Sequence, residues 1–390
     1  MLLSLGLALL MGLSFAWLCK KMNLPSLVGF ILTGILLGPY ILDLMDDSLM
    51  GISKDLRTIS LLIILLRAGL SLDIQKLLKQ GKTALFLTFV PATFEILGTL
   101  LFTQYVFGWS WMDGFILGTI LAAVSPAVIV PRMIQLIESH LGTKRGIPQM
   151  IMAGASADDI YVILLFTVGL ALKQTNSFDF RVVAWLPIEI LLGALYGFLL
   201  GKVLVILFQK YHMRDTIKVL IIIGLSLVLY ALENYHYSGL IAVVSMALTI
   251  HQVYPVLANR LVKKYEKIWV FMEMLLFILI GALLDITIIP KIIVPGLSLI
   301  GFVLVFRLLG VYISTSKSNI TIKEKHFMAL SYIPKATVQA SIGAIPLALG
   351  LSHGVEILGI AVIAILVTAP FGAFLIDQAK THLLTYENRS

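Results

Sequence analysis

Charged residues are scarce in this chain. They make up 13% of its 390 residues, whereas hydrophobic residues make up 59%. A soluble domain usually has about a quarter of its residues charged, so this composition excludes a soluble globular protein. No long polar or low-complexity stretch separates the apolar segments. Residues 1–390 are therefore interpreted as one polytopic, all-α membrane protein.

Cysteine is nearly absent. The single residue, Cys19, excludes an intrachain disulfide.

The apolar start, Met1–Leu18, has neither a basic region nor a small-residue cleavage site. This pattern favours a retained first helix over a cleaved signal peptide.

Acidic residues are fewer than basic ones, and the formal net charge is +8. Most of the 29 Lys and Arg residues fall in short loops between apolar stretches. This placement reflects membrane topology rather than nucleic-acid binding. We expect neither a nucleic-acid partner nor a cofactor, and no enzymatic activity.

Apolar stretches long enough to cross a bilayer recur along the chain, since a span needs about 20 residues. The sequence predicts thirteen of them: 2–18, 25–42, 57–72, 83–107, 112–136, 148–172, 183–207, 217–232, 238–252, 267–284, 291–313, 325–350 and 353–377. With the N-terminus outside, 20 Lys and Arg fall in or beside inner loops and 5 in or beside outer loops. This bias predicts an outer N-terminus and a cytoplasmic C-terminus.

The chain also repeats itself weakly. Gly69–Asp73 and Gly281–Asp285 both read G-x-x-L-D, 212 residues apart, and Pro126 and Pro334 interrupt spans 208 residues apart. The near-equal offsets suggest two five-span repeats, spans 2–6 and 9–13, in opposite orientation. Inverted repeats with paired interrupted helices are typical of secondary transporters. The alternative is that this pattern is merely common where a span ends.

Asp158 and Asp159 lie side by side inside an otherwise apolar span. A carboxylate at bilayer depth costs about 3 kcal/mol on insertion scales, and two adjacent ones repel each other when ionised. Adjacent helical residues point about 100° apart, so the two are expected to do different work. The small residues before them, Ala153–Ala157, would allow another backbone to approach closely. We interpret the pair as an ion or proton site, against the alternative of a structural hydrogen-bonded pair.

Prolines predict two breaks in the spanning helices. Pro126, within Ala123–Ala127, and then Pro131 are expected to unwind the fifth span, and Pro334, within Ser331–Thr337, the twelfth. Exposed backbone at membrane depth is tolerated only where it lines protein or a cavity. Half-helix ends carry partial charges that bind ions. An ordinary proline kink is the alternative for each break alone.

Three further charged residues lie deep in predicted spans. Lys335 follows the second break and needs a partner, for which Asp158 or Asp159 is the obvious candidate. Glu95 and Arg307 are candidates for a second ion pair. Arg307 lies about six residues from the inner end of its span, so snorkelling to the surface is its alternative.

The chain resembles the cation/proton antiporter superfamily, in particular the NHA group of sodium/proton antiporters. The resemblance covers nearly the whole chain, from the second span to the last. The stretches that carry it are Leu24–Pro39, Ala123–Val128, Gly154–Asp159 and Ile333–Ala340, of which the last is the most specific.

The resemblance implies a role for each candidate residue. Asp159 would be the main carrier of cation and proton, Asp158 would pair with Lys335, and Glu95 would pair with Arg307. Many electrogenic members of the superfamily have a lysine at the position of Arg307, so the resemblance leaves the stoichiometry open.

The resemblance also implies an architecture. Residues 83–172 and 291–377 would form a mobile core domain with two crossing interrupted helices. Residues 1–82 and 217–290 would form a dimerisation domain, and 183–207 would link the two. A homodimer in the lipid of a prokaryotic cell (inner) membrane is expected.

Competition for one site is the expected mechanism. Burial disfavours an ionised aspartate, so Asp159 would hold either a proton or Na⁺ (or Li⁺). Hard cations prefer oxygen ligands, so Asp159, Ser125 and carbonyls freed at the breaks are the expected ligands of Na⁺ or Li⁺. Thr337 belongs to the second interrupted helix. K⁺/H⁺ exchange and a cation channel are the alternatives. An intramembrane aspartyl protease needs two aspartates from different helices, which an adjacent pair does not provide.

Overall fold

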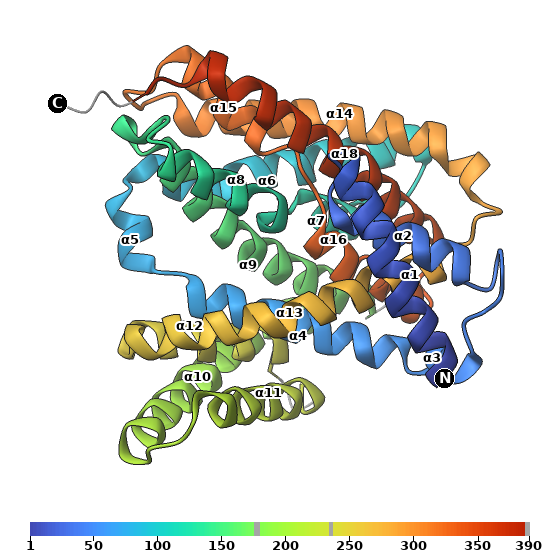
Figure 1. The fold of residues 1–390 in the computed structure, drawn as a ribbon, viewed down its shortest axis with the longest axis horizontal. Coiled ribbons are helices and arrows are strands. Elements are labelled where there is room, and N and C mark those ends of the chain that lie inside the picture. The colour runs from blue at the N-terminus through green and yellow to red at the C-terminus, as the bar shows by residue number, and fades with distance from the viewer. Residues whose placement is uncertain (175–179, 234–236, 387–390) are drawn as a thin grey trace. The chain divides into compact units, whose positions relative to one another are not determined.

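The computed structural model describes residues 1–174, 180–233 and 237–386. Within these ranges the secondary structure is almost entirely helical, and the β-structure is limited to an isolated bridge between Leu141 and Tyr386. The predicted all-α class is confirmed (Figure 1). Seven helices of the described ranges are long and apolar enough to cross a membrane by length and composition.

Every predicted span overlaps a helix or a group of successive helices. The helices are α1 (Leu2–Lys21), α2 (Ser26–Leu37), α3 (Asp47–Gly51), α4 (Ser53–Ser71), α5 (Ile74–Lys79), α6 (Lys82–Phe102), α7 (Trp111–Ala122), α8 (Pro126–Glu138), α9 (Ile147–Gln174), α10 (Phe180–Lys210), α11 (Asp215–Ala231), α12 (Gly239–Val253), α13 (Pro255–Leu283), α14 (Ile289–Thr315), α15 (Ile322–Ser331), α16 (Thr337–Ile342), α17 (Ile345–Ala348) and α18 (Gly354–Leu383).

Two features of the helices were not predicted: two short connecting helices and the early start of α13. The short helices α3 and α5 connect longer ones and are too short to span. Helix α13 begins at Pro255, well before the predicted start of its span at residue 267. Its first turns carry Arg260, Lys263 and Lys264, all of them exposed. Hydropathy detects only the apolar part of such a helix.

The first predicted break is present between α7 and α8. Helix α7 ends at Ala122, Ala123 is extended (φ −70°, ψ 140°), and α8 starts at Pro126. Proline has no N–H to donate and suits the first turn of a helix. Pro131, in contrast, lies inside α8, which continues to Glu138. The expectation that Pro131 also unwinds the chain is wrong, because α8 is already a new helix and Pro131 only removes one of its internal bonds.

The second predicted break is also present. Helix α15 ends at Ser331 and α16 begins at Thr337, which are the bounds expected around Pro334. An unpredicted interruption follows at Gly343 and Ala344, between α16 and α17. The twelfth span is therefore built from three short helices.

The chain forms two compact units. The first comprises 1–57, 76–163 and 273–390, and the second comprises 58–75 and 164–272. In the first, α14 packs along α6, and α18 packs against both α14 and α15 (Figure 1). The predicted core domain, dimerisation domain and linker divide the chain at other positions and stay a prediction.

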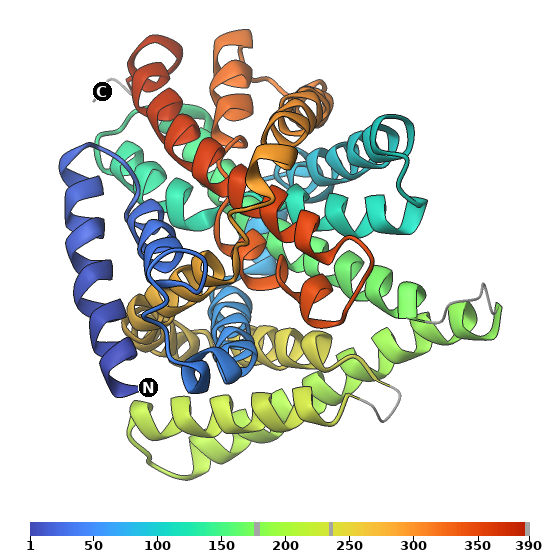
Figure 2. The same ribbon diagram turned by 90° about the vertical axis from the view of Figure 1, so that its right-hand side faces the viewer.

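Glycines set the close packing in the second unit. There α12 packs against both α10 and α11 (Figure 2). Gly193, Gly197 and Gly201, spaced four residues apart on α10, each face α12, where a Cβ would meet α12 or the residue that precedes it. Such a small-residue stripe lets two helices approach closely in a membrane.

Candidate functional site

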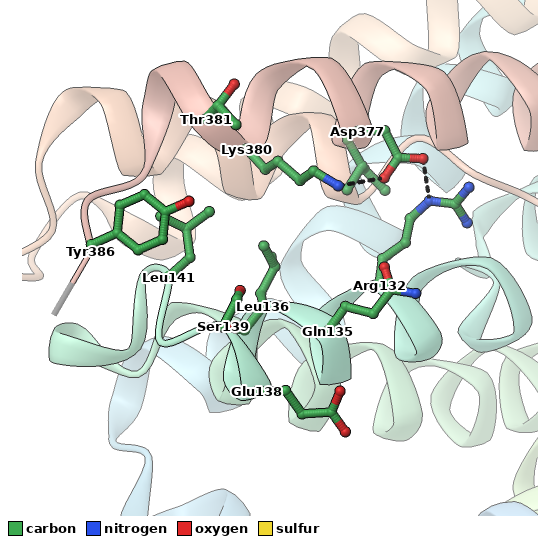
Figure 3. A pocket seen from close by; sticks show the side chains of 11 residues that line it. Arg132, Gln135, Leu136, Glu138, Ser139, Leu141, Asp377, Lys380, Thr381 and Tyr386 are labelled. Atoms are coloured by element: carbon green, nitrogen blue, oxygen red, sulfur yellow. Dashed lines mark hydrogen bonds and ion pairs between the residues drawn. The ribbon is translucent and has the colours of Figure 1, made fainter.

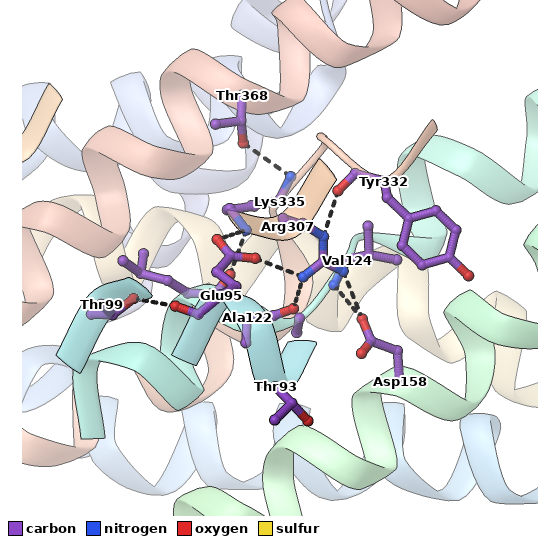
Figure 4. Close-up of polar contacts among 12 residues, drawn as sticks. Thr93, Glu95, Thr99, Ala122, Val124, Asp158, Arg307, Tyr332, Lys335 and Thr368 are labelled. Atoms are coloured by element: carbon purple, nitrogen blue, oxygen red, sulfur yellow. Dashed lines mark hydrogen bonds and ion pairs between the residues drawn. The ribbon is translucent and has the colours of Figure 1, made fainter. Parts of the chain in front are cut away.

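The two breaks meet inside the first unit. The N–H of Ser125, in the first break, donates to the carbonyl of Pro334, in the second, at 2.9 Å. Helix α16 packs against α7 beside this contact. Figure 4 shows the charged side chains of α6, α9 and α14 converging on the same place. We call this region the crossing.

Arg307 of α14 is the centre of the crossing (Figure 4). Its guanidinium forms ion pairs with Glu95 of α6 at 2.6 Å and with Asp158 of α9 at 3.0 Å. The side chain is fully buried, so the snorkelling alternative is wrong and the expected pairing with Glu95 is present. The planar fork of arginine is suited to bridging two carboxylates at once.

Lys335 has a different partner from the one expected. Its ammonium lies 2.6 Å from Glu95 Oε1 and donates to the carbonyl of Leu121 at 2.5 Å. The described residues show no ion pair between Lys335 and Asp158, since Asp158 is bound to Arg307. The expected pairing of Asp158 with Lys335 is therefore wrong. The reason is that Arg307 reaches both carboxylates, whereas Lys335 supplies a single point charge beside Glu95.

The last carbonyls of α7 and the first of the break are all bound by side chains. Leu121 accepts from Lys335, Ala122 accepts from Arg307, and Leu121 and Ala123 both accept from the amide of Gln339. A helix C-terminus carries partial negative charge, which cations and N–H donors stabilise. Each of these three carbonyls therefore already accepts a hydrogen bond within the crossing, and a role as cation ligands stays a prediction for them.

The two aspartates are both buried, with exposed fractions of 0% for Asp158 and 4% for Asp159. Asp158 Oδ2 accepts from the backbone N–H of Val124 at 3.0 Å as well as from Arg307. Asp158 is thus bound into the crossing by two donors, as expected for the structural member of the pair. The carrier role of Asp159 stays a prediction.

Hydroxyls gather at the same place. Ser125 directly precedes α8 and Thr337 is the first residue of α16, and their buried hydroxyls form no hydrogen bond with the described residues. Buried polar groups are almost always hydrogen-bonded. Oxygen atoms of this kind are suitable ligands for a hard cation or for water.

Two residues of the crossing were not identified from the sequence. The carbonyl oxygen of Tyr332 accepts from Arg307 Nε at 2.7 Å, and the Tyr332 hydroxyl packs on Gly154 of α9. At Gly154 the small-residue run before Asp158 thus admits the Tyr332 side chain as well as the backbone of Leu87 on α6. Gln339 is the second residue that was not identified. The sequence feature that could have indicated it is a single amide, four residues after Lys335, in an otherwise apolar half-helix.

A separate cavity of about 510 Å³ lies between α8 and α18, away from the crossing. Figure 3 shows Asp377 in ion pairs with both Arg132 and Lys380. The distances are 3.1 Å to Arg132 and 3.4 Å to Lys380. Glu138 also lines this cavity, so the formal charges of its two cations, Arg132 and Lys380, and its two carboxylates, Asp377 and Glu138, cancel. It carries none of the predicted site residues.

Comparison with known proteins places the chain in a family. Residues 5–377 match the model of the family described as "Sodium/hydrogen exchanger, transmembrane". The chain is 33% identical to the human protein named sodium/hydrogen exchanger 9B2, over 93% of this chain and 70% of that protein. It is 30% identical to human sodium/hydrogen exchanger 9B1, over 93% and 73%. The chain belongs to the sodium/hydrogen exchanger family.

A solved structure shows the same fold. The sodium proton antiporter MjNhaP1 from Methanocaldococcus jannaschii superposes with a TM-score of 0.82 over 97% of both chains, at 22% identity. The predicted antiporter fold is confirmed. As a member of this family the chain is a multi-pass membrane transporter, and the resemblance to cation/proton antiporters is confirmed.

Proposed function

We propose that this chain exchanges Na⁺ for H⁺ across its membrane, with the two ions competing for Asp159. Membership of the sodium/hydrogen exchanger family supports exchange of these ions and favours it over a cation channel. Two helices interrupted beside buried carboxylates are the arrangement that secondary transporters use for their ion sites.

The observation that carries the proposal is a buried aspartate pair on α9 beside the two interrupted helices. Asp158 accepts from Val124 in the first break and from Arg307, which also binds Tyr332 next to the second break. Asp159 follows it on the same helix and is buried as well. Burial disfavours an ionised carboxylate, so uptake of a proton or of a cation stabilises it, and the two ions compete when both need the same carboxylate.

Exposure favours Asp159 as the residue that takes up the exchanged ion. Glu95 and Asp158 are fully buried, with 0% exposed, whereas 4% of Asp159 is exposed. An exchanged ion has to enter and leave, so it needs a carboxylate that solvent can reach. Glu95 and Asp158 are also held by the guanidinium of Arg307, and an arriving cation would have to displace that charge.

We propose a stoichiometry of one Na⁺ for one H⁺. If the single carboxylate of Asp159 carries the two ions in turn, the exchange would be electroneutral. The cation would be held by Asp159 together with the hydroxyl of Ser125, because hard cations prefer oxygen ligands.

Alternating access completes the scheme. The residues 83–172 and 291–377 would move as a core against a dimerisation domain, 1–82 and 217–290, so that the crossing opens to each side in turn. We place the N-terminus outside and the C-terminus in the cytoplasm, because Lys and Arg concentrate in the inner loops. A homodimer in the lipid of a prokaryotic cell membrane is the assembly that we propose.

The test is exchange in proteoliposomes that contain a pH-sensitive dye. A proton gradient is imposed, and Na⁺, Li⁺ or K⁺ is added in turn. We expect dequenching with Na⁺ and Li⁺, unchanged when the membrane potential is clamped, and none with Asp159→Asn. The control is Asp377→Asn, which makes the same chemical change at the separate cavity and should leave exchange intact.

Two outcomes would contradict the proposal. A response to K⁺ alone would instead support K⁺/H⁺ exchange. Wild-type exchange by Asp159→Asn would remove Asp159 from the mechanism.

A further inference from the structure

Gln339 of α16 joins the second interrupted helix to the first. Its side-chain amide is buried, with 1% exposed, and Nε2 donates to the carbonyls of Ala123 at 2.7 Å and Leu121 at 3.3 Å. Both acceptors are carbonyl oxygens, so the amide has only one chemically sensible orientation. A flipped amide would set Oε1 against two other oxygens.

The contact with Ala123 reaches Asp158 through a single peptide group. The carbonyl of Ala123 and the N–H of Val124 belong to the same planar group. Gln339 binds the oxygen of this peptide, and Asp158 Oδ2 accepts from its N–H at 3.0 Å. The two side chains therefore hold the peptide from opposite edges.

This peptide needs to be held, because it lies in the break. It is outside both helices, since α7 ends at Ala122 and α8 starts at Pro126. A peptide plane without helical hydrogen bonds is free to rotate, and rotation would turn the Val124 N–H away from Asp158. Hydrogen bonds in a chain also polarise one another, which strengthens the donor that the carboxylate receives.

We propose that Gln339 is a positioning residue for ion exchange: through the Ala123–Val124 peptide it fixes the hydrogen bond that stabilises ionised Asp158. The inference rests on the proposed function and adds a residue to it. Because Asp159 is the next residue of α9, a fixed Asp158 also fixes the backbone that carries Asp159. Gln339 thereby helps to hold the pair in the geometry that binds Na⁺.

The charged and titratable groups that face Asp158 come from several elements: Arg307 of α14, Tyr332 and Lys335 of the second break, Glu95 of α6 beyond Arg307, and Asp159 on α9 itself. Gln339 is neutral, and its amide hydrogens are directed at backbone carbonyls. A change at Gln339 therefore alters one hydrogen bond to Asp158 without altering the charge of the crossing.

The test compares the KM for Na⁺ and the maximal rate of exchange in proteoliposomes for the wild type, Gln339→Met and Ser341→Ala. Methionine keeps the length of the side chain and removes its donors. Ser341 is the matched control, because it lies on the same half-helix, is buried, and donates to Thr337 within that helix. Losing the hydrogen bond that holds the Ala123–Val124 peptide should raise the KM for Na⁺ by about threefold to tenfold with little change in the maximal rate, and Ser341→Ala should leave the KM unchanged.

A second comparison isolates the path. On an Asp158→Asn background, Gln339→Met should no longer weaken the Na⁺-induced thermal stabilisation, a readout that needs no turnover. A weakening that persists there would overturn the proposal, as would a lowered maximal rate with an unchanged KM for Na⁺. Gln339→Asn, whose amide is one methylene too short, replaces the methionine variant if that one does not fold. Absence of Na⁺ exchange in the wild type would instead refute the proposed function itself.

Discussion

The break between α7 and α8 and the break between α15 and α16 both centre on a proline, yet their chemistry is complementary. The first contains Ala123, Val124 and Ser125 and has no charged side chain. What it offers is backbone: the carbonyls at the end of α7 and the N–H of Val124. The second break offers Lys335 and, one turn later, Gln339, which bind those same carbonyls.

The difference shows what the two prolines do and do not determine. Matched prolines determine where the backbone opens in each half. The side chains around them determine which half supplies acceptors and which supplies donors. The crossing is stable because the negative end of α7 meets the positive charge of Lys335 and Arg307. A substitution that breaks this complementarity should destabilise the protein most where the side chain bridges several charged partners.

Removal of Arg307 should have the largest effect, because Arg307 touches both breaks and two carboxylates. Arg307→Met leaves Asp158 without its ion pair, and a broken buried pair costs about 3–5 kcal/mol. We expect a protein that aggregates on extraction or melts far below the wild type in detergent. Arg307→Lys keeps the charge and should recover part of the loss. Equal melting temperatures for wild type and Arg307→Met would contradict the role of Arg307 as the centre.

Lys335→Met should have the second-largest effect. Glu95 keeps its bond to Arg307, so the loss of stability should be about 1–3 kcal/mol, the cost of leaving one buried acceptor unsatisfied. The crossing then has one positive charge fewer. Proton uptake should strengthen, and the half-maximal pH of exchange should move upward. A downward movement in the proteoliposome assay would show that Lys335 does not act through its charge.

The contact between the second break and α9 should have a smaller effect. In Gly154→Ala the new methyl would meet the Tyr332 hydroxyl at less than contact distance. Such overpacking costs about 1–3 kcal/mol. Tyr332→Phe removes that hydroxyl and should restore the melting temperature of Gly154→Ala. Failure of this rescue would place the strain at Leu87, the other neighbour of Gly154.

Far from the crossing, Arg145 and Glu324 join the loop after α8 to the start of α15 at 2.6 Å. Burial raises the pKa of Glu324, but hydrogen bonds from Thr321 and Arg145 outweigh it, and the net pKa is lowered from 4.5. The ion pair therefore stabilises the fold above the usual glutamate range and is lost as the pH falls through the lowered pKa. Arg145→Gln should cost about 1 kcal/mol or less, measured by melting at pH 7, and nothing once acid has protonated Glu324.

Much of this arrangement was predictable from the sequence. The prolines predicted both breaks, Pro334 with the bounds observed, and depth in apolar spans identified Glu95, Asp158 and Arg307 as ion-pairing residues. The apolar stretches predicted every long helix. These features depend on local residue type, which can be read directly from the chain.

The remaining contacts depend on three-dimensional reach. Nothing in the sequence says that Lys335 lies nearer Glu95 than Asp158, because that distance is set by how α6, α14 and the second break pack. The role of Tyr332 had no signal, since one tyrosine in an apolar span resembles many others. The sequence contained a weak signal for Gln339, which is a single amide among apolar neighbours.

The central claim is that Na⁺ and H⁺ compete for Asp159, and calorimetry on the purified protein tests it most directly. Titration of Na⁺ in buffers of different ionisation enthalpy measures the protons released as the cation binds. We predict a proton release that approaches one per Na⁺ at acidic pH, an apparent affinity that falls about tenfold for each unit of acidification there, and no binding by Asp159→Asn. Na⁺ binding without proton release at any pH, or unchanged binding by Asp159→Asn, would contradict the account.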